Sequence, residues 1–183
     1  DLITSPDSSI TSYKDKKTQT GSSPMNPEAG SYEDAVDKIF MQCQKENRDV
    51  QALFFALEEN GGFLRYPHVD RKDGYDPRTR DWYQQAKANQ NDFFASDAVK
   101  ISPTKAVLSV LKRVSDTSGK FKGILGINID FDALTSALNS GSDSAISAKI
   151  ILIDHKGKII ANSFNNTELC ADIANANIKE LQG

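Results

Sequence analysis

The spacing of hydrophobic and polar positions predicts that ordered structure begins at Ser31. Residues 1–30 are rich in Ser, Thr, Pro, Gly and Asn and show neither a helical nor a strand period, which is typical of a loop-like segment. From Ser31, a suitable N-cap, acidic residues occupy the first turn and apolar positions recur at helical spacing. The pattern predicts a helix over 31–46 whose buried face carries Ala35, Val36, Ile39, Phe40 and Cys43.

The next part of the chain predicts a hairpin, a second helix and three strands. Two apolar runs flank Glu-Asn-Gly-Gly within 50–67, which is a hairpin pattern. After a loop, Asp76 and Pro77 are the residue types favoured at the N-cap and first position of a helix, and helical composition continues to about residue 89. Further strands are expected at 93–101, 104–114 and 121–129, the last two joined by a turn.

These elements predict an α+β fold, with an antiparallel five-stranded sheet and its flanking helices on one side. A short helix at 131–138 and a linker at 141–145 are expected before a second hairpin over 148–162. The second hairpin repeats the layout of the first, which indicates two modules of related design. We therefore expect a complete module over 31–140 and an incomplete one over 141–183.

Composition and charge exclude several classes of protein. The net charge is −3 and no basic stripe is present, so no nucleic-acid partner is expected. Cys43 and Cys170 form no CxxC pair and lie far in sequence from His68 and His155, so no metal site is expected. No apolar run approaches the ~18–20 residues that span a bilayer. The chain has no phosphate-binding loop and no hydrolase motif, so neither a cofactor nor an enzymatic activity is expected.

The segment GYDPRTRDWY, residues 74–83, concentrates the candidate chemistry and holds the only tryptophan. Arg80 can bind a carboxylate through two parallel charge-assisted hydrogen bonds. The alternative for this arginine is a structural ion pair with a nearby acid, which would be Asp70, Asp73, Asp76 or Asp81. Trp82 and Tyr83 are adjacent on a helix and point about 100° apart. One of them can line a pocket while the other packs beneath it.

The order of these elements and two of their sequences resemble a known family of sensor domains. YDPRTRDWY after a hairpin, followed by GILGINIDFDAL, is similar to the membrane-distal module of a double Cache domain, and IILIDHKGKIIAN resembles the opening hairpin of the membrane-proximal module. The resemblance covers about residues 31–183. It implies a PAS-like sensor fold on the periplasmic side of the bacterial inner membrane, in a membrane-anchored, homodimeric chemoreceptor. Its partner would be a small-molecule ligand or a periplasmic binding protein.

In amino-acid-binding members of this family, one set of residues binds the backbone of the ligand. The resemblance indicates which positions of this chain correspond to them. Here Tyr75, Arg80, Trp82 and Tyr83 match, whereas the later tyrosine falls near Ala98 and is missing. The position of an aspartate on the last strand is Asn128, which keeps hydrogen bonds but cannot neutralise an ammonium group. Asp97 or Asp130 can substitute for it. The expected ligand is a small metabolite, either a carboxylate or an amino-acid-like compound, and the pattern favours a small carboxylate, or a ligand outside the amino-acid class, over a standard amino acid. The candidate ligand-binding residues are Tyr75, Arg80, Trp82, Tyr83, Asp97 and Asn128.

Two other functions stay open at this point. The same fold serves as the sensor domain of histidine kinases and of cyclic-dinucleotide enzymes. It also serves as an interaction module when its pocket has closed, and a Trp82 buried in a filled core would favour that role.

Overall fold

The computed structural model describes residues 31–69, 71, 74–89, 91–102, 105–131, 150–154, 156–162 and 169–175. These residues form two compact units. The first comprises those up to Ser96 and from Val110 to Asn128, and the second those from Asp97 to Ser109 and from Ile129 onward. The N-terminal segment, the expected helix after Phe131 and the expected linker lie outside the described residues. The expected module boundary near residue 140 stays a prediction.

Helix α1 spans Ser31–Glu46, as the apolar spacing predicts. Tyr32, Val36 and Phe40 are buried on its inner face, with Cys43 packed against them. Ile39, which was expected on this face, is 54% exposed. The expectation for Ile39 is wrong because the buried stripe advances in steps of four and three residues, which leaves position 39 at its edge.

The hairpin and the second helix follow in the expected order. Strands β1 (Val50–Leu57) and β2 (Phe63–Tyr66) pair antiparallel, with Phe55 opposite Leu64. Asp76 caps a 3-10 turn, η2 (Pro77–Thr79), by accepting a hydrogen bond from the backbone N–H of Arg78. Helix α2 (Asp81–Ala88) then starts anew, because Arg80 has an extended backbone with φ −90° and ψ 143°. The single helix expected from Pro77 to residue 89 is therefore two elements.

The sheet has the order β2-β1-β6-β5-β3, and β4 also pairs with β5. It has six strands where five were expected, because the strand predicted at 93–101 is broken into β3 (Phe94–Ala95) and β4 (Val99–Ser102). Phe94 pairs with Leu111 and Val99 with Val107. Phe94 and Val99 are five residues apart, whereas their partners Leu111 and Val107 are four residues apart. The broken strand therefore contains one extra residue, as at a β-bulge. The partner strand is β5 (Lys105–Ser115), whose other neighbour in the sheet is β6 (Phe121–Asp130).

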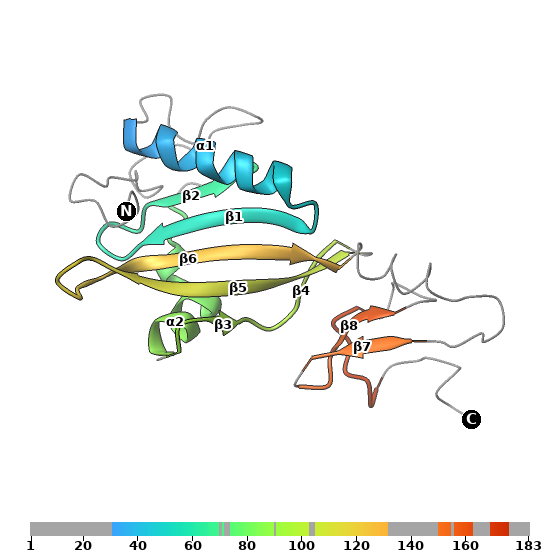
Figure 1. Cartoon of the computed structure of the whole chain (residues 1–183). Helices are drawn as coiled ribbons and strands as arrows, with labels where there is room; N and C mark the ends of the chain where they lie inside the picture. Colours follow the sequence, from blue (N-terminus) through green and yellow to red (C-terminus); the bar gives the residue numbers. More distant parts are fainter. Residues whose placement is uncertain are drawn as a thin grey trace. The chain divides into compact units, whose positions relative to one another are not determined.

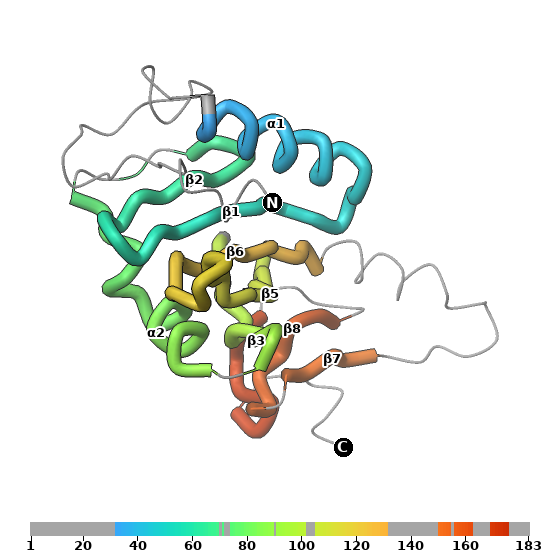
Figure 2. Tube along the Cα trace, turned by 60° about the vertical axis from the view of Figure 1, so that its left-hand side comes forward, coloured from blue at the N-terminus to red at the C-terminus, as the bar shows by residue number. Residues whose placement is uncertain are grey.

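In the first unit, α1 and α2 cover opposite faces of the sheet, so the expectation of helices on one side is wrong. Leu53 and Phe55 of β1 pack against α1, whereas Phe54 and Ala56 pack on the other face with α2. Since neighbouring side chains of a strand point to opposite faces, the continuous apolar run of β1 requires cover on both. Figures 1 and 2 show α1 beside the β1–β2 hairpin, with α2 beyond β6 and β5.

The second unit contains the predicted second hairpin, β7 (Ile151–Ile153) and β8 (Ile159–Asn162), which pair antiparallel. Its core gathers Ala106, Ile159 and Leu169, with Ile151, Cys170 and Ile173 packed against them. Cys43 and Cys170 are both free thiols. Within the described ranges, no helix is both long enough and apolar enough to cross a membrane.

Candidate functional site

A row of four aromatic rings lies on the face of the sheet that α2 covers. Trp82 meets Phe54 edge-on, with ring centroids 5.2 Å apart. Phe54 lies 5.7 Å from Phe63, which lies 5.4 Å from Tyr75. The hairpin thus supplies two rings that join Tyr75, in the loop before η2, to Trp82 in α2. This row brings two of the predicted ligand-binding residues, Tyr75 and Trp82, together as partly buried side chains that pack against the buried Phe54 and Phe63.

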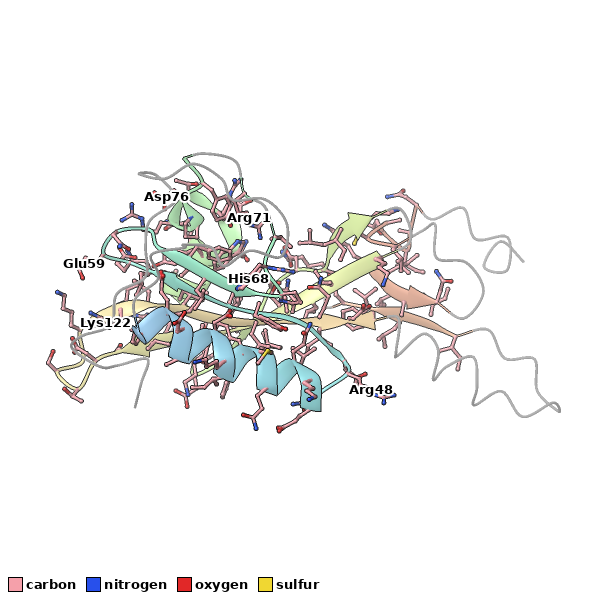
Figure 3. All side chains as sticks on the ribbon, turned by 90° about the horizontal axis from the view of Figure 1, so that it is seen from above. Arg48, Glu59, His68, Arg71, Asp76 and Lys122 are labelled. Atoms are coloured by element: carbon pink, nitrogen blue, oxygen red, sulfur yellow. The ribbon has the colours of Figure 1, made fainter. Side chains whose placement is uncertain are left out.

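Guanidinium groups flank one end of the row. The guanidinium carbons of Arg71 and Arg80 each lie 5.0 Å from the centroid of the Tyr75 ring, and that of Arg71 lies 5.5 Å from the Phe63 ring. Figure 3 shows Arg71 in the segment that joins β2 to α2. Such contacts place the positive charge over the electron-rich ring faces. We call Phe54, Phe63, Tyr75, Trp82, Arg65, Arg71 and Arg80 the aromatic–arginine cluster.

Arg65 brings a third positive charge to the cluster from β2. It pairs with Phe54 in the strand register, and its side chain is buried. It donates hydrogen bonds to the carbonyl of Pro67 and, at 3.3 Å, to the side-chain oxygen of Gln51. Burial, together with the charge of Arg71, lowers the pKa of Arg65 to about 10. Arg65 therefore stays charged at neutral pH in an environment that disfavours its charge.

Tyr75 does not offset these charges. Burial raises the pKa of its phenol, although the nearby Arg71 and Arg80 favour the ionised form. The hydroxyl is therefore protonated at neutral pH and can donate a hydrogen bond.

The structural alternative for Arg80 finds no support among the acids that the structure describes. Asp76 forms its ion pair with Arg78 instead, at 3.0 Å between Nε and Oδ1. In the described part of the chain, no carboxylate lies within ion-pair distance of Arg80. Asp70 and Asp73 lie outside the described residues. Arg78 also donates to the Glu58 carbonyl at 2.8 Å, which ties the turn before α2 to the end of β1.

Tyr83 belongs to the core beneath the cluster. Its side chain is fully buried, and its hydroxyl donates a 2.8 Å hydrogen bond to Glu58 at the end of β1. Lys87, one turn further along α2, pairs with the other oxygen of Glu58 at 2.7 Å. Trp82 is only partly buried. The sequence left open which of the two side chains would line the candidate site. Trp82 belongs to the cluster, and Tyr83 packs in the core below it.

Glu58 is expected to give the unit a pH-dependent part of its stability. Burial acts to raise the pKa of Glu58, but hydrogen bonds from Lys87 and Tyr83, with the charges of Lys87 and Arg78, outweigh it and lower the pKa below 4.5. A carboxyl group with a lowered folded-state pKa stabilises the fold above its unfolded-state pKa, and this contribution disappears as the pH falls through the folded-state value.

Replacing Glu58 with Gln should therefore lower the free energy of unfolding at pH 7 and have a smaller effect at pH 3. Urea unfolding at both pH values measures this difference. Glu59→Gln is the matched control, because Glu59 is the exposed neighbour and should change little at either pH. An equal loss for Glu58→Gln at both pH values would show that its charge contributes nothing.

The other predicted site residues fall in two places. Asn128 is half-buried on β6 and donates a 3.4 Å hydrogen bond to the same Gln51 oxygen that accepts from Arg65, which links it to the cluster. Asp97 belongs to the second unit, where it pairs with Lys156 at 2.8 Å, and Asp130 pairs with Lys105 at 3.6 Å. The structure therefore gathers Tyr75, Arg80, Trp82 and Asn128 around one cluster, places Tyr83 beneath it and gives Asp97 a partner of its own.

Three residues of this surface were missed at the sequence level. Arg65 interrupts the apolar run FLRY. A charged residue is rare in a strand that is buried on both faces, so its presence could have indicated a functional position. Arg71 lies in a loop, where no period indicates a direction. Gln51 contributes through hydrogen bonds that depend on the register of separate strands. Within the described ranges, no group of three or more His, Cys, Asp or Glu side chains is arranged to hold a metal ion.

Comparison with known proteins gives one family match and two kinds of relative. The family model of the Cache domain, dCache_1, matches residues 1–183. The methyl-accepting chemotaxis protein McpA of Bacillus subtilis is 31% identical over 142 residues, and McpG of Pseudomonas putida is 28% identical over 103 residues. These matches cover 75% and 56% of this chain but 20% and 16% of the relatives. The chain thus spans a fifth or less of the length of these relatives.

Solved structures of chemoreceptor ligand-binding domains share the fold. The domain of the Pseudomonas aeruginosa amino-acid chemoreceptor PctC, in complex with GABA, superposes with a TM-score of 0.64 and 21% identity, over 81% of this chain and 63% of that one. The domain of the Pseudomonas fluorescens chemoreceptor CtaA, in complex with L-serine, gives 0.58 and 19%, over 80% and 60%. The predicted α+β, PAS-like fold class is confirmed.

Proposed function

The chain belongs to the Cache domain family, and on this basis we propose that it is the periplasmic ligand-binding sensory domain of a bacterial transmembrane chemoreceptor. The parent protein is membrane-anchored and homodimeric, and its signal comes from a ligand with different affinities for two conformations of the receptor. The relatives, which are methyl-accepting chemotaxis proteins, favour this receptor class over sensor kinases and cyclic-dinucleotide enzymes. The domain performs no catalysis.

The aromatic–arginine cluster is the observation that carries the proposal. Tyr75, Arg80 and Trp82 match the family pattern and meet on one surface of the first unit, where Arg80 is exposed beside the Tyr75 ring. Arg80 also hydrogen-bonds the side chain of Tyr75. A guanidinium has five N–H donors, so others remain for a ligand, and their fork geometry fits a carboxylate. A small anion is therefore the ligand that this surface is best suited to hold.

The ligand class follows from the charges around Asn128. GABA and L-serine, which PctC and CtaA bind, share a carboxylate and an ammonium group. Arg80 supplies the group that a carboxylate needs. Asn128 and Arg65 both donate to the side-chain oxygen of Gln51, and three guanidinium groups lie in the cluster. An ammonium group would meet positive charge there, and Asn128 has no carboxylate to compensate it. The ligand is therefore a small carboxylate that lacks an amino group.

The proposal is tested by calorimetric titration of this chain with propionate, butyrate, pyruvate, L-alanine and L-serine. We expect the carboxylates to bind more tightly than the amino acids. Replacing Arg80 with Ala should weaken carboxylate binding roughly ten- to a hundredfold, the loss of one hydrogen-bonded charge contact. Arg48→Ala is the matched control, since Figure 3 shows Arg48 at the turn between α1 and β1, away from Arg71.

Two results would contradict the proposal in different ways. Binding of the amino acids alone would overturn the ligand class but leave a sensory domain. No binding of any of the five compounds, with a folded protein, would favour an interaction module that acts through a protein partner.

A further inference from the structure

We propose that the aromatic–arginine cluster contains two anion-binding points, one at Arg80 and one at Arg71, so that its preferred ligand is a short dicarboxylate. The inference rests on the proposed function and specifies the ligand of the same site. Arg71 has no counterpart in the family pattern from which Arg80 was predicted.

The two guanidinium groups are close but have different surroundings. Both lie 5.0 Å from the centroid of the Tyr75 ring, so their carbons are no more than twice that distance apart. Arg80 is exposed, whereas Arg71 is half-buried and also contacts the Phe63 ring. A short chain with an anionic group at each end is long enough to reach from one of these cations to the other within this limit.

Arg71 lacks an acceptor that it needs. Its Nε is buried and has no hydrogen-bond partner among the residues that the structure describes. The guanidinium carbon lies over the rings of Phe63 and Tyr75, whose ring faces do not replace an oxygen acceptor for its N–H donors. A buried donor without an acceptor is costly, and a ligand oxygen that accepts from it recovers this cost. This donor is the point at which we place the second acceptor group of the ligand.

The local charge determines which acceptor is favoured. Arg65 is buried on the same face, and the positive charge of Arg71 helps to lower its pKa to about 10, which records repulsion between the two groups. A neutral acceptor would satisfy Arg71 without relieving this repulsion. A carboxylate does both, because it accepts two N–H bonds from one guanidinium and offsets the excess charge. An ammonium group at the same place would add a further cation.

Three compounds with the same four-carbon skeleton separate these cases: succinate, butyrate and 4-aminobutyrate. They carry a second carboxylate, a methyl group and an ammonium group at the far end. We expect succinate to bind at least tenfold more tightly than either of the others, by titration calorimetry of the chain at constant pH and ionic strength. Equal affinities for succinate and butyrate in the unmodified protein would overturn the second anion point without the need for any variant.

Arginine variants assign the two points. Arg71→Gln should weaken succinate binding far more than butyrate binding, so that the two affinities become similar, whereas Arg80→Ala should weaken both to a similar extent. Arg71→Lys keeps the charge but loses the fork, and should lose most of the preference for succinate. An equal loss for both ligands in Arg71→Gln contradicts the assignment. Failure of all three ligands to bind would overturn the carboxylate site itself, whereas Arg80-dependent binding without a preference for succinate would overturn only this inference.

Discussion

Replacing Tyr83 with Ala is expected to lower the free energy of unfolding by about 3–5 kcal/mol, the usual cost of removing a large buried aromatic side chain. Tyr83 is fully buried and packs with Phe54, Ala56 and Ile124 in the core beneath α2. Its ring also lies edge-on to Trp82, with centroids 5.5 Å apart. Urea unfolding followed by circular dichroism measures the loss as a lower midpoint with an unchanged slope.

The control Tyr83→Phe keeps the ring and removes the hydroxyl. It should cost about 0.5–1.5 kcal/mol, the contribution of one hydrogen bond, because Glu58 retains Lys87 as a partner. A loss in Tyr83→Phe as large as that in Tyr83→Ala would mean that the bond to Glu58, and not the packing of the ring, holds α2. A loss below about 1 kcal/mol in Tyr83→Ala would contradict the assignment of Tyr83 to the core.

The elements that the sequence predicts well are those in which local periodicity decides the structure. The helix over 31–46 and the first hairpin follow from apolar spacing and from the Gly-rich turn, and both occur as expected. The break of the predicted strand into β3 and β4 has no such local signal. It arises because both pieces pair with β5 in registers that differ by one residue. Register depends on partner strands that are distant in sequence.

In the candidate site, too, the sequence predicts the residues that lie in one short segment and misses those that tertiary structure brings in. Tyr75, Arg80 and Trp82 lie within eight consecutive residues and were predicted together. The sequence also limits Trp82 and Tyr83 to different directions, but their roles are decided by Glu58, which the hairpin brings to Tyr83. Arg71 enters the site through contacts with rings from two other segments. Its role therefore depends on tertiary structure that no short pattern encodes.

The second large effect is expected for Gly123→Ala, in β6 next to β1. A Cβ atom at position 123 would lie 2.1 Å from the carbonyl oxygen of Ala56, which belongs to the backbone and cannot rotate away. Gly123 also has φ 156°, which side-chain-bearing residues rarely adopt. Backbone strain and overpacking each cost about 1–3 kcal/mol. The variant should therefore lose about 2–5 kcal/mol of unfolding free energy, measured by urea unfolding.

Gly119→Ala separates the two contributions to this loss. Gly119 has φ 84°, but no atom lies within 4 Å of a Cβ built there, so its substitution adds strain without a clash. It should cost about 1–2 kcal/mol. An equal loss at both positions would show that β6 moves away from β1 at little cost. Since β1 carries Phe54 and β6 carries Asn128, such movement would also shift the ligand-binding surface, and the affinity for succinate would fall in Gly123→Ala alone. If the contact between β6 and β1 is rigid, Gly123→Ala should instead be destabilised. The molecules that remain folded should then bind succinate with the same affinity as the unmodified chain.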